Sequence, residues 1–172
     1  SMFLSGCLRA SITAPKIPDN LNKPSQVTMT KINGVTIGLP KGWQNVEKIP
    51  KNYKEPGGVV FLKHRNYGKI IIFKSPTISD GRYGQIFTRT MIDAAMPDAR
   101  AHGKPMSLDN DAIVEIYKGT VSAEGERFPM RAYEAYNISN GLGGKYFMHT
   151  IVAEKNATMD LFYDFIAIAS SL

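Results

Sequence analysis

Few side chains of this 172-residue chain are of the types that carry out catalysis, and they lie far apart in the sequence. Cys7 is the only cysteine, and the three histidines are His64, His102 and His149. No two histidines stand two or four residues apart, so no local pair of metal ligands exists. His64 is also flanked by two basic residues that would repel a cation. We therefore expect no metal site and no cofactor.

Other catalytic patterns are equally weak. Nucleophilic catalysis needs a nucleophile beside an oriented base, and the chain has no G-x-S-x-G motif. The glycines of Gly141–Lys145 lack the spacing of a phosphate-binding loop, so we expect a hairpin turn there. The acidic pairs Asp109/Asp111 and Glu124/Glu126 fall on predicted turns, where solvated carboxylates are common. We expect no enzymatic activity.

Cys7 has a different kind of neighbourhood, because it follows Leu4, Ser5 and Gly6. An aliphatic residue, two small residues and a cysteine resemble the lipobox of bacterial lipoproteins, in which the thiol is acylated and becomes the mature N-terminus. Acyl chains anchor a protein by about 0.8 kcal/mol per buried methylene group. Only Met2 and Phe3 precede the motif after Ser1, so we expect a truncated signal.

The segment after Cys7 is rich in proline, with Pro15, Pro18 and Pro24 among polar residues. Prolines at this density disfavour helices and central strands, so an extended spacer is expected. We therefore expect residues 1–26 to be a signal remnant and linker, and residues 27–172 to form one domain.

Positive charge is concentrated early in that domain. The net charge of the chain is +6, and residues 41–74 hold eight basic residues against Glu47 and Glu55. Such a surface favours anionic lipid or an acidic partner. The aromatic residues nearby fit no nucleic-acid-binding motif, so no nucleic acid is expected. The candidate basic surface consists of Lys41, Lys48, Lys51, Lys54, Lys63, Arg65, Lys69 and Lys74.

Alternating and β-branched segments separated by turn residues predict strands, and apolar residues spaced three and four apart predict helices. The turns include Asn33-Gly34 and Glu124-Gly125, both typical of hairpins. The predicted strands are residues 27–32, 35–39, 58–65, 69–75, 112–123, 127–139 and 144–155. The predicted helices are residues 81–96, with Ser79 or Asp80 as the cap, and residues 157–172. This ββ-ββ-α-βββ-α order predicts an α+β fold with a mostly antiparallel sheet of about six to seven strands and two main helices.

The first helix is expected to bury one apolar stripe, and Asn156 is the expected N-cap of the second helix. The expected stripe consists of Tyr83, Ile86, Phe87, Thr90, Met91 and Ala94. Aromatic residues of the last three strands form a candidate groove for a peptide or lipid tail, with ordinary sheet packing as the alternative. This candidate groove consists of Tyr117, Tyr133, Tyr136, Tyr146 and Phe147.

The segment GVTIGLPKGWQ, residues 34–44, resembles the start of PsbP-like domains, in which a hairpin strand leads to a proline and then a tryptophan. The closing LFYDFIAIASSL is similar to their C-terminal helix. The resemblance implies an α/β/α sandwich without catalytic residues. Within this family, the bacterial DcrB-like proteins are often small lipoproteins, which agrees with Cys7.

Two functions are compatible with these observations. The first is a non-enzymatic, lipid-anchored envelope protein that faces the periplasm and binds an unidentified protein partner. Leu8 after Cys7 favours the outer membrane, since aspartate there favours inner-membrane retention in enteric lipoproteins. The second is a cytosolic adaptor, resembling the chaperones of type VI secretion effectors, that binds an apolar helix.

Overall fold

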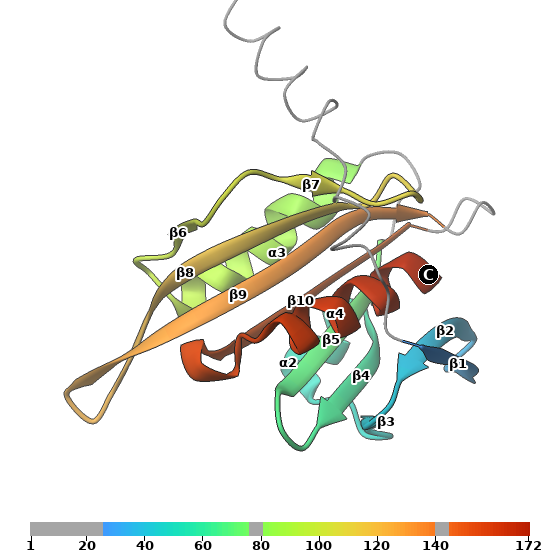
Figure 1. Cartoon of the computed structure of the whole chain (residues 1–172), viewed down its shortest axis with the longest axis horizontal. Helices are drawn as coiled ribbons and strands as arrows, with labels where there is room; N and C mark the ends of the chain where they lie inside the picture. Colours follow the sequence, from blue (N-terminus) through green and yellow to red (C-terminus); the bar gives the residue numbers. More distant parts are fainter. Residues whose placement is uncertain (1–25, 76–80, 140–144) are drawn as a thin grey trace, which may run out of the picture.

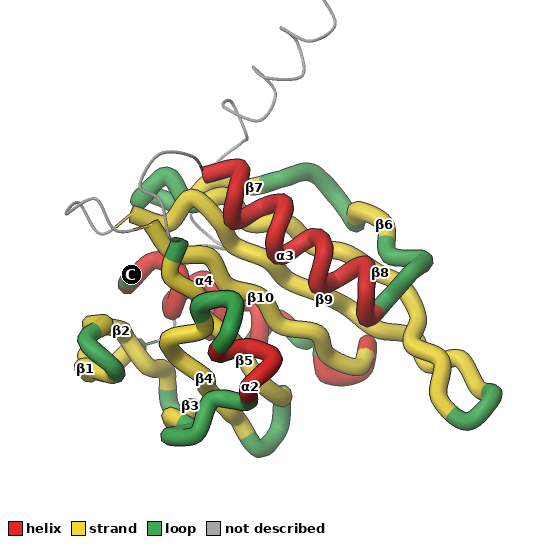
Figure 2. The backbone as a smooth tube through the Cα atoms, turned by 180° about the vertical axis from the view of Figure 1, so that it is seen from behind, coloured by secondary structure: helices red, strands yellow, loops and turns green. Residues whose placement is uncertain are grey.

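The structure is a computed structural model and describes residues 26–75, 81–139 and 145–172. Its helices are α2 (Lys51–Lys54), α3 (Gly81–Ala95) and α4 (Met159–Ser171), with a short 3-10 helix η1 (Glu154–Asn156). Its strands are β1 (Val27–Ile32), β2 (Val35–Pro40), β3 (Trp43–Asn45), β4 (Gly58–His64), β5 (Gly68–Lys74), β6 (Arg100–Ala101), β7 (Met106–Ser107), β8 (Ile113–Ala123), β9 (Glu126–Ser139) and β10 (Lys145–Ala153). The two main helices lie on opposite faces of a large sheet, α4 on the near face in Figure 1 and α3 on the near face in Figure 2.

The main sheet has eight strands in the order β3-β4-β5-β10-β9-β8-β6, and β7 also pairs with β8. Every strand pair in it is antiparallel. The α+β fold with a mostly antiparallel sheet and two main helices is therefore confirmed. The sheet is larger than predicted, because β3, β6 and β7 have only two or three residues and so show no periodic signal.

The first hairpin forms a separate two-stranded sheet of β1 and β2. Its turn contains Asn33 and Gly34 with φ angles of 50° and 80°, the left-handed conformation that a tight hairpin requires. Strand β2 packs on α4, and the Gly38 N–H donates a hydrogen bond of 2.8 Å to the Ser171 hydroxyl. The hairpin is therefore held largely by the C-terminal helix and forms no strand pair with the main sheet.

Helix α4 is apolar around most of its circumference and is buried over most of its length, as expected. It begins later than predicted, because η1 ends at Asn156 and Thr158 is the N-cap. The Thr158 side chain accepts a hydrogen bond of 3.3 Å from the Leu161 N–H. The Trp43 indole N–H donates a buried hydrogen bond of 2.9 Å to Asp164 and so connects the main sheet to this helix.

Helix α3 presents only part of the predicted stripe to the sheet, since Phe87 and Met91 pack against the core whereas Ile86, Thr90 and Ala94 are exposed. Ile86 has 66% of its surface exposed, whereas Gly84, Thr88 and Ile92 are buried. A Cβ atom on Gly84 would lie 2.9 Å from the Cβ of Phe147, so this glycine allows close packing of the helix on β10. The helix is therefore rotated so that small and polar residues also face the sheet, and apolar periodicity alone does not identify such residues.

Candidate functional site

All eight residues of the candidate basic surface are exposed. Lys63 on β4 and Lys69 on β5 lie directly opposite each other, and the Lys69 ammonium is 5.7 Å from the centre of the Phe61 ring. Lys74, by contrast, pairs in register with Tyr146, whose side chain belongs to the core under α4. The eight residues therefore do not all lie on one face of the protein. We call Lys63 and Lys69 the strand lysines.

A pocket of about 730 Å³ lies between the turn of the β1–β2 hairpin and the segment around α2. Three residues of the basic surface, Lys48, Lys51 and Lys54, line it, and we call them the pocket lysines. The other lining residues are Asn33, Glu47, Ile49, Gly58 and Val59. Part of the predicted basic surface thus surrounds a cavity, which the one-dimensional charge count could not show.

The five aromatic residues of the candidate groove are all buried and do not form one groove. Tyr133 and Tyr146 belong to the core under α4, whereas Tyr117, Tyr136 and Phe147 belong to clusters on the α3 face. The alternation of side chains along a strand explains this division, because neighbouring residues point to opposite faces. Sheet packing is the role that the structure gives them.

The proposed lipidation site Cys7 lies outside the described residues, together with Leu4, Ser5 and Gly6. The turn expected at residues 141–144 also lies outside them. None of the helices in the described ranges has the length and apolarity needed to span a bilayer. Within the same ranges, no group of three or more His, Cys, Asp or Glu side chains is placed to hold a metal ion.

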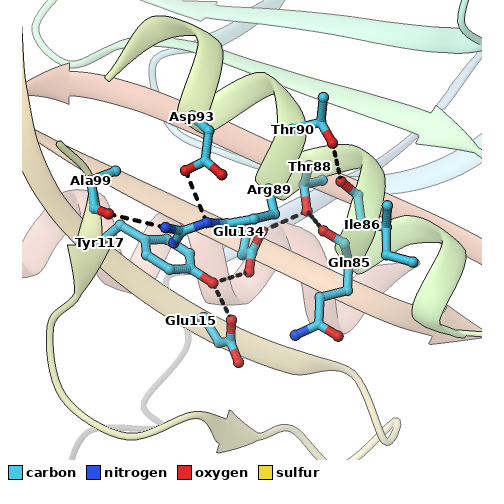
Figure 3. A network of polar contacts seen from close by, with 10 residues as sticks. All are labelled: Gln85, Ile86, Thr88, Arg89, Thr90, Asp93, Ala99, Glu115, Tyr117 and Glu134. Atoms are coloured by element: carbon cyan, nitrogen blue, oxygen red, sulfur yellow. Dashed lines mark hydrogen bonds and ion pairs between the residues drawn. The ribbon is translucent and has the colours of Figure 1, made fainter. Parts of the chain in front are cut away.

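The sequence reasoning missed a cluster of polar side chains that lies under α3 (Figure 3). Glu115 on β8 and Glu134 on β9 are directly opposite each other in the sheet. Glu134 is 0% exposed, and Glu115 is half-buried. The Thr88 hydroxyl, on α3, donates a hydrogen bond of 2.5 Å to Oε2 of Glu134. The cluster thus connects α3 to two neighbouring strands.

Tyr117 lies between the two carboxyl groups. Its hydroxyl oxygen is 2.6 Å from Oε1 of Glu134 and is also hydrogen-bonded to Oε2 of Glu115. The Tyr136 hydroxyl donates a further hydrogen bond of 3.3 Å to Oε1 of Glu115. Because a tyrosine hydroxyl has one hydrogen, its two close carboxyl contacts need a second proton, which a carboxylic acid provides.

Glu134 is the carboxyl group that holds this proton. Its burial, followed by its hydrogen-bonded contact with Glu115, raises its pKa from 4.5 to about 8. The same environment raises the pKa of Tyr117 and of Tyr136, chiefly through burial, so both remain neutral donors. The cluster therefore stores a proton at neutral pH in the interior of the protein.

Arg89 covers the Tyr117 side of this cluster. Its guanidinium carbon lies 4.2 Å from the centre of the Tyr117 ring, a cation–π contact. The same group forms an ion pair of 2.9 Å with Asp93 and donates a hydrogen bond of 3.0 Å to the Ala99 carbonyl. Arg89 thus fixes the position of Tyr117 through its ring.

His149 on β10 lies opposite Glu134 on the other side, and its ring stacks on Phe73 at 5.7 Å. Burial lowers its pKa from 6.5 to about 4, so the ring is neutral at physiological pH. Its Nδ1 atom is buried without a hydrogen-bond partner. The carboxylic acid, the two phenols and the neutral imidazole therefore lie near one another. They lie beneath α3, where solutes have little access to them.

One sequence signal was available for this cluster. Ile113, Glu115 and Tyr117 alternate along one strand, so the position of Glu115 is on the face that also buries Tyr117. A glutamate between two such positions is atypical and marks a polar contact inside the core. The partner residue, Glu134, required knowledge of the strand register.

No protein-family model matches this chain, and no curated protein matches it. Among solved structures, it is similar to LpqN of Mycobacterium tuberculosis, described as involved in cell envelope biogenesis. That likeness has 10% sequence identity and a TM-score of 0.47, and it covers 91% of this chain and 95% of that one. A second similar structure is that of PA94 of Pseudomonas aeruginosa, a protein of unknown function described as a putative regulator. This likeness has 8% sequence identity and a TM-score of 0.32, and it covers 77% of this chain and 86% of that one.

Proposed function

We propose that this chain is a lipid-anchored, non-enzymatic protein of the bacterial cell envelope, which acts as an accessory factor by binding another protein. The observation that carries the proposal is the motif Leu4-Ser5-Gly6-Cys7, which contains the only cysteine and precedes a proline-rich segment and a folded domain. A spacer of this kind separates a domain from the surface to which it is attached.

The burial of the acid–base groups supports a non-enzymatic role. Glu134 and His149 lie under α3, where a dissolved substrate would not reach them. The hydrogen bond from Thr88 to Glu134 joins α3 to the sheet, and the ring contact of His149 with Phe73 joins β10 to β5, so the cluster acts in the stability of the fold.

The same proposal includes membership of the DcrB-like branch of PsbP-like domains and a location at the outer membrane, facing the periplasm. The branch is supported by the order of the main elements and by the hairpin that leads to Pro40 and Trp43. The outer membrane is favoured by Leu8, which follows the acylated cysteine.

The candidate basic surface is the proposed contact with the protein partner. Its eight side chains are exposed, so they can attract an acidic surface through solvent. Neutralising the strand lysines should slow association with that partner and reduce its dependence on salt. Unchanged association rates at low salt would contradict this part of the proposal.

Fractionation of cells tests the anchor. The protein is expressed from its native gene, with all upstream coding sequence, and the membrane fraction is separated from the soluble fraction. We expect the wild type to stay in the membrane fraction until detergent is added. We expect the Cys7→Ala protein to carry no acyl chains. Ser5→Ala retains a small residue before the cysteine and is the matched control, which should behave as the wild type.

A soluble wild-type protein, with no effect of Cys7→Ala, would contradict the lipid anchor. It would favour the cytosolic adaptor, because an unmodified thiol at Cys7 has no role in membrane attachment.

A further inference from the structure

The pocket beside α2 has walls that are fixed by backbone contacts. The Asn33 side-chain amide donates a hydrogen bond of 2.8 Å to the Val59 carbonyl and so connects the turn of the β1–β2 hairpin to β4. On the other side, the Val46 N–H donates a hydrogen bond of 2.8 Å to the Phe61 carbonyl. The first contact joins the two sheets beside the pocket, and the second continues the pairing of β3 with β4, so the pocket is present before any ligand binds.

Helix α2 determines where two of the pocket lysines lie. Tyr53 stacks on Phe61, with ring centres 6.0 Å apart, and so holds the helix against the sheet. Lys51 and Lys54 are three residues apart, a spacing that places side chains on one side of a helical turn. The chain also packs closely at Gly58, where a Cβ atom would lie 2.5 Å from the Tyr53 carbonyl oxygen.

The pocket lining has a positively charged part and an apolar part. The three pocket lysines are compact, mobile ammonium groups, which bind phosphate as point charges, and no arginine is present to favour a planar carboxylate. Lys51 has an ion pair of 3.6 Å with Glu55, but both side chains are mostly exposed, so this pair is readily exchanged for a ligand. Ile49 and Val59 contribute apolar wall.

Glu47 restricts the ligand further. Its carboxyl group lines the same pocket and would repel a second anionic group, whereas it can accept hydrogen bonds from hydroxyls. The Asn33 amide, which also lines the pocket, can contact hydroxyls in the same way. The volume of about 730 Å³ lies in the range of small-molecule sites and far exceeds the size of one phosphate ion.

We propose that this pocket binds the phosphate ester of a small polyol, with the phosphate at the pocket lysines and the hydroxyls towards Glu47 and Asn33. Glycerol phosphate is the smallest ligand of this class. It occurs both as a soluble ester and as the headgroup of phosphatidylglycerol, and the chemistry of the pocket is the same for the two sources. The inference concerns a small ligand and holds whether or not Cys7 is acylated.

Titration of the unlipidated 172-residue chain tests the ligand class. Calorimetry at low salt is carried out with glycerol 3-phosphate, with glycerol and with inorganic phosphate. We expect saturable binding of glycerol 3-phosphate, weaker binding of inorganic phosphate and none of glycerol. Absence of saturable binding by both glycerol 3-phosphate and phosphatidylglycerol vesicles would overturn the proposal.

Matched charge variants test the location. Lys51→Gln/Lys54→Gln removes two pocket lysines and should weaken binding at least about tenfold. Lys63→Gln/Lys69→Gln removes the same charge from the strand lysines and should retain the wild-type affinity. Since all four side chains are exposed, both variants should keep the wild-type melting temperature. Equal weakening in both variants would show general charge attraction and would overturn the pocket as the site.

Vesicle flotation distinguishes the two sources. Vesicles of phosphatidylglycerol are compared with vesicles of phosphatidylcholine, using the same two variants. Flotation that needs the pocket lysines but not the strand lysines supports the proposal with the lipid headgroup as ligand. Binding of glycerol 3-phosphate without such flotation supports it with the soluble ester as ligand. Because acylation of Cys7 is measured separately, failure here leaves the proposed anchor unaffected.

Discussion

Glu134 and Glu115 lie directly opposite each other on neighbouring strands, and the hydroxyl of Tyr117 is hydrogen-bonded to both carboxyl groups. Two ionised carboxylates at this separation in the interior would repel each other strongly. The proton on Glu134 removes that repulsion and completes the hydrogen bonds. The pair is therefore a structural element whose contribution depends on pH.

The first prediction concerns the alkaline side. Because the folded protein holds the Glu134 proton up to about pH 8, whereas an ordinary glutamic acid loses it near 4.5, the stability that Glu134 contributes is largest below this window and falls across it. Between pH 6.5 and 8 the fall should be about 2 kcal/mol. Urea unfolding measured at intervals of pH gives this slope.

The variant Glu134→Gln keeps a hydrogen-bonding amide but has no proton to lose. Its free energy of unfolding should be nearly constant over the same range, while Glu126→Gln, at an exposed position of the same strand, should retain the wild-type slope. Parallel profiles of the free energy of unfolding against pH for the wild type and Glu134→Gln would contradict the raised pKa of Glu134.

The second prediction concerns the acidic side. Burial keeps His149 neutral down to about pH 4, whereas the unfolded chain protonates it below 6.5. This difference lowers stability as the pH falls from 6.5 to 4, opposite in sign to the effect of Glu134. His149→Leu should therefore be relatively more stable at pH 5 than at pH 7, when compared with the wild type by chemical unfolding. An equal difference at both pH values would contradict the neutral, buried imidazole.

The third prediction is opposite in sign to the effect that helix propensity alone would have. Replacing a glycine in a helix by alanine normally stabilises it by up to about 1 kcal/mol. Gly84→Ala should instead lower the melting temperature, because the new Cβ would meet the Cβ of Phe147 at 2.9 Å. Thr90→Ala, at an exposed position of the same helix, is the control and should change stability little. A stabilised Gly84→Ala protein would contradict the close packing of α3 on β10.

The fourth prediction tests the contact between β3 and α4. Trp43→Phe keeps an aromatic ring but loses the indole N–H that donates to buried Asp164. Loss of a hydrogen bond to a buried charged group costs about 1–3 kcal/mol. A double-mutant cycle with Asp164→Ala, which removes the acceptor oxygens, measured by urea unfolding, should show that the two substitutions are coupled. Simple additivity would rule out the hydrogen bond as a source of stability.

The long elements of this fold were predictable because their signals are local. The hairpin turn at Asn33-Gly34 and the apolar helix α4 both follow from residues close together in the sequence. The short strand β3 and the helix α2 were missed, since four residues or fewer show no period. The orientation of α3 was predicted only in part, because two of the residues that it buries, Gly84 and Thr88, serve close packing and a hydrogen bond to Glu134.

The candidate site was less predictable for the same reason. The basic residues were identifiable from composition, but the pocket beside three of them depends on contacts such as that of Asn33 with Val59. The five aromatic residues of the candidate groove were recognised as a group, yet strand alternation divides them between two faces. The carboxyl pair needed the register of β8 against β9, which no local pattern provides.

The most direct measurement for the proposed function is the mass of the N-terminal peptide of the mature protein, purified in detergent after expression from the native gene. We predict a peptide that begins at Cys7 and carries a diacylglyceryl thioether. A peptide that contains Leu4–Gly6 joined to an unmodified Cys7 thiol would contradict the lipid anchor.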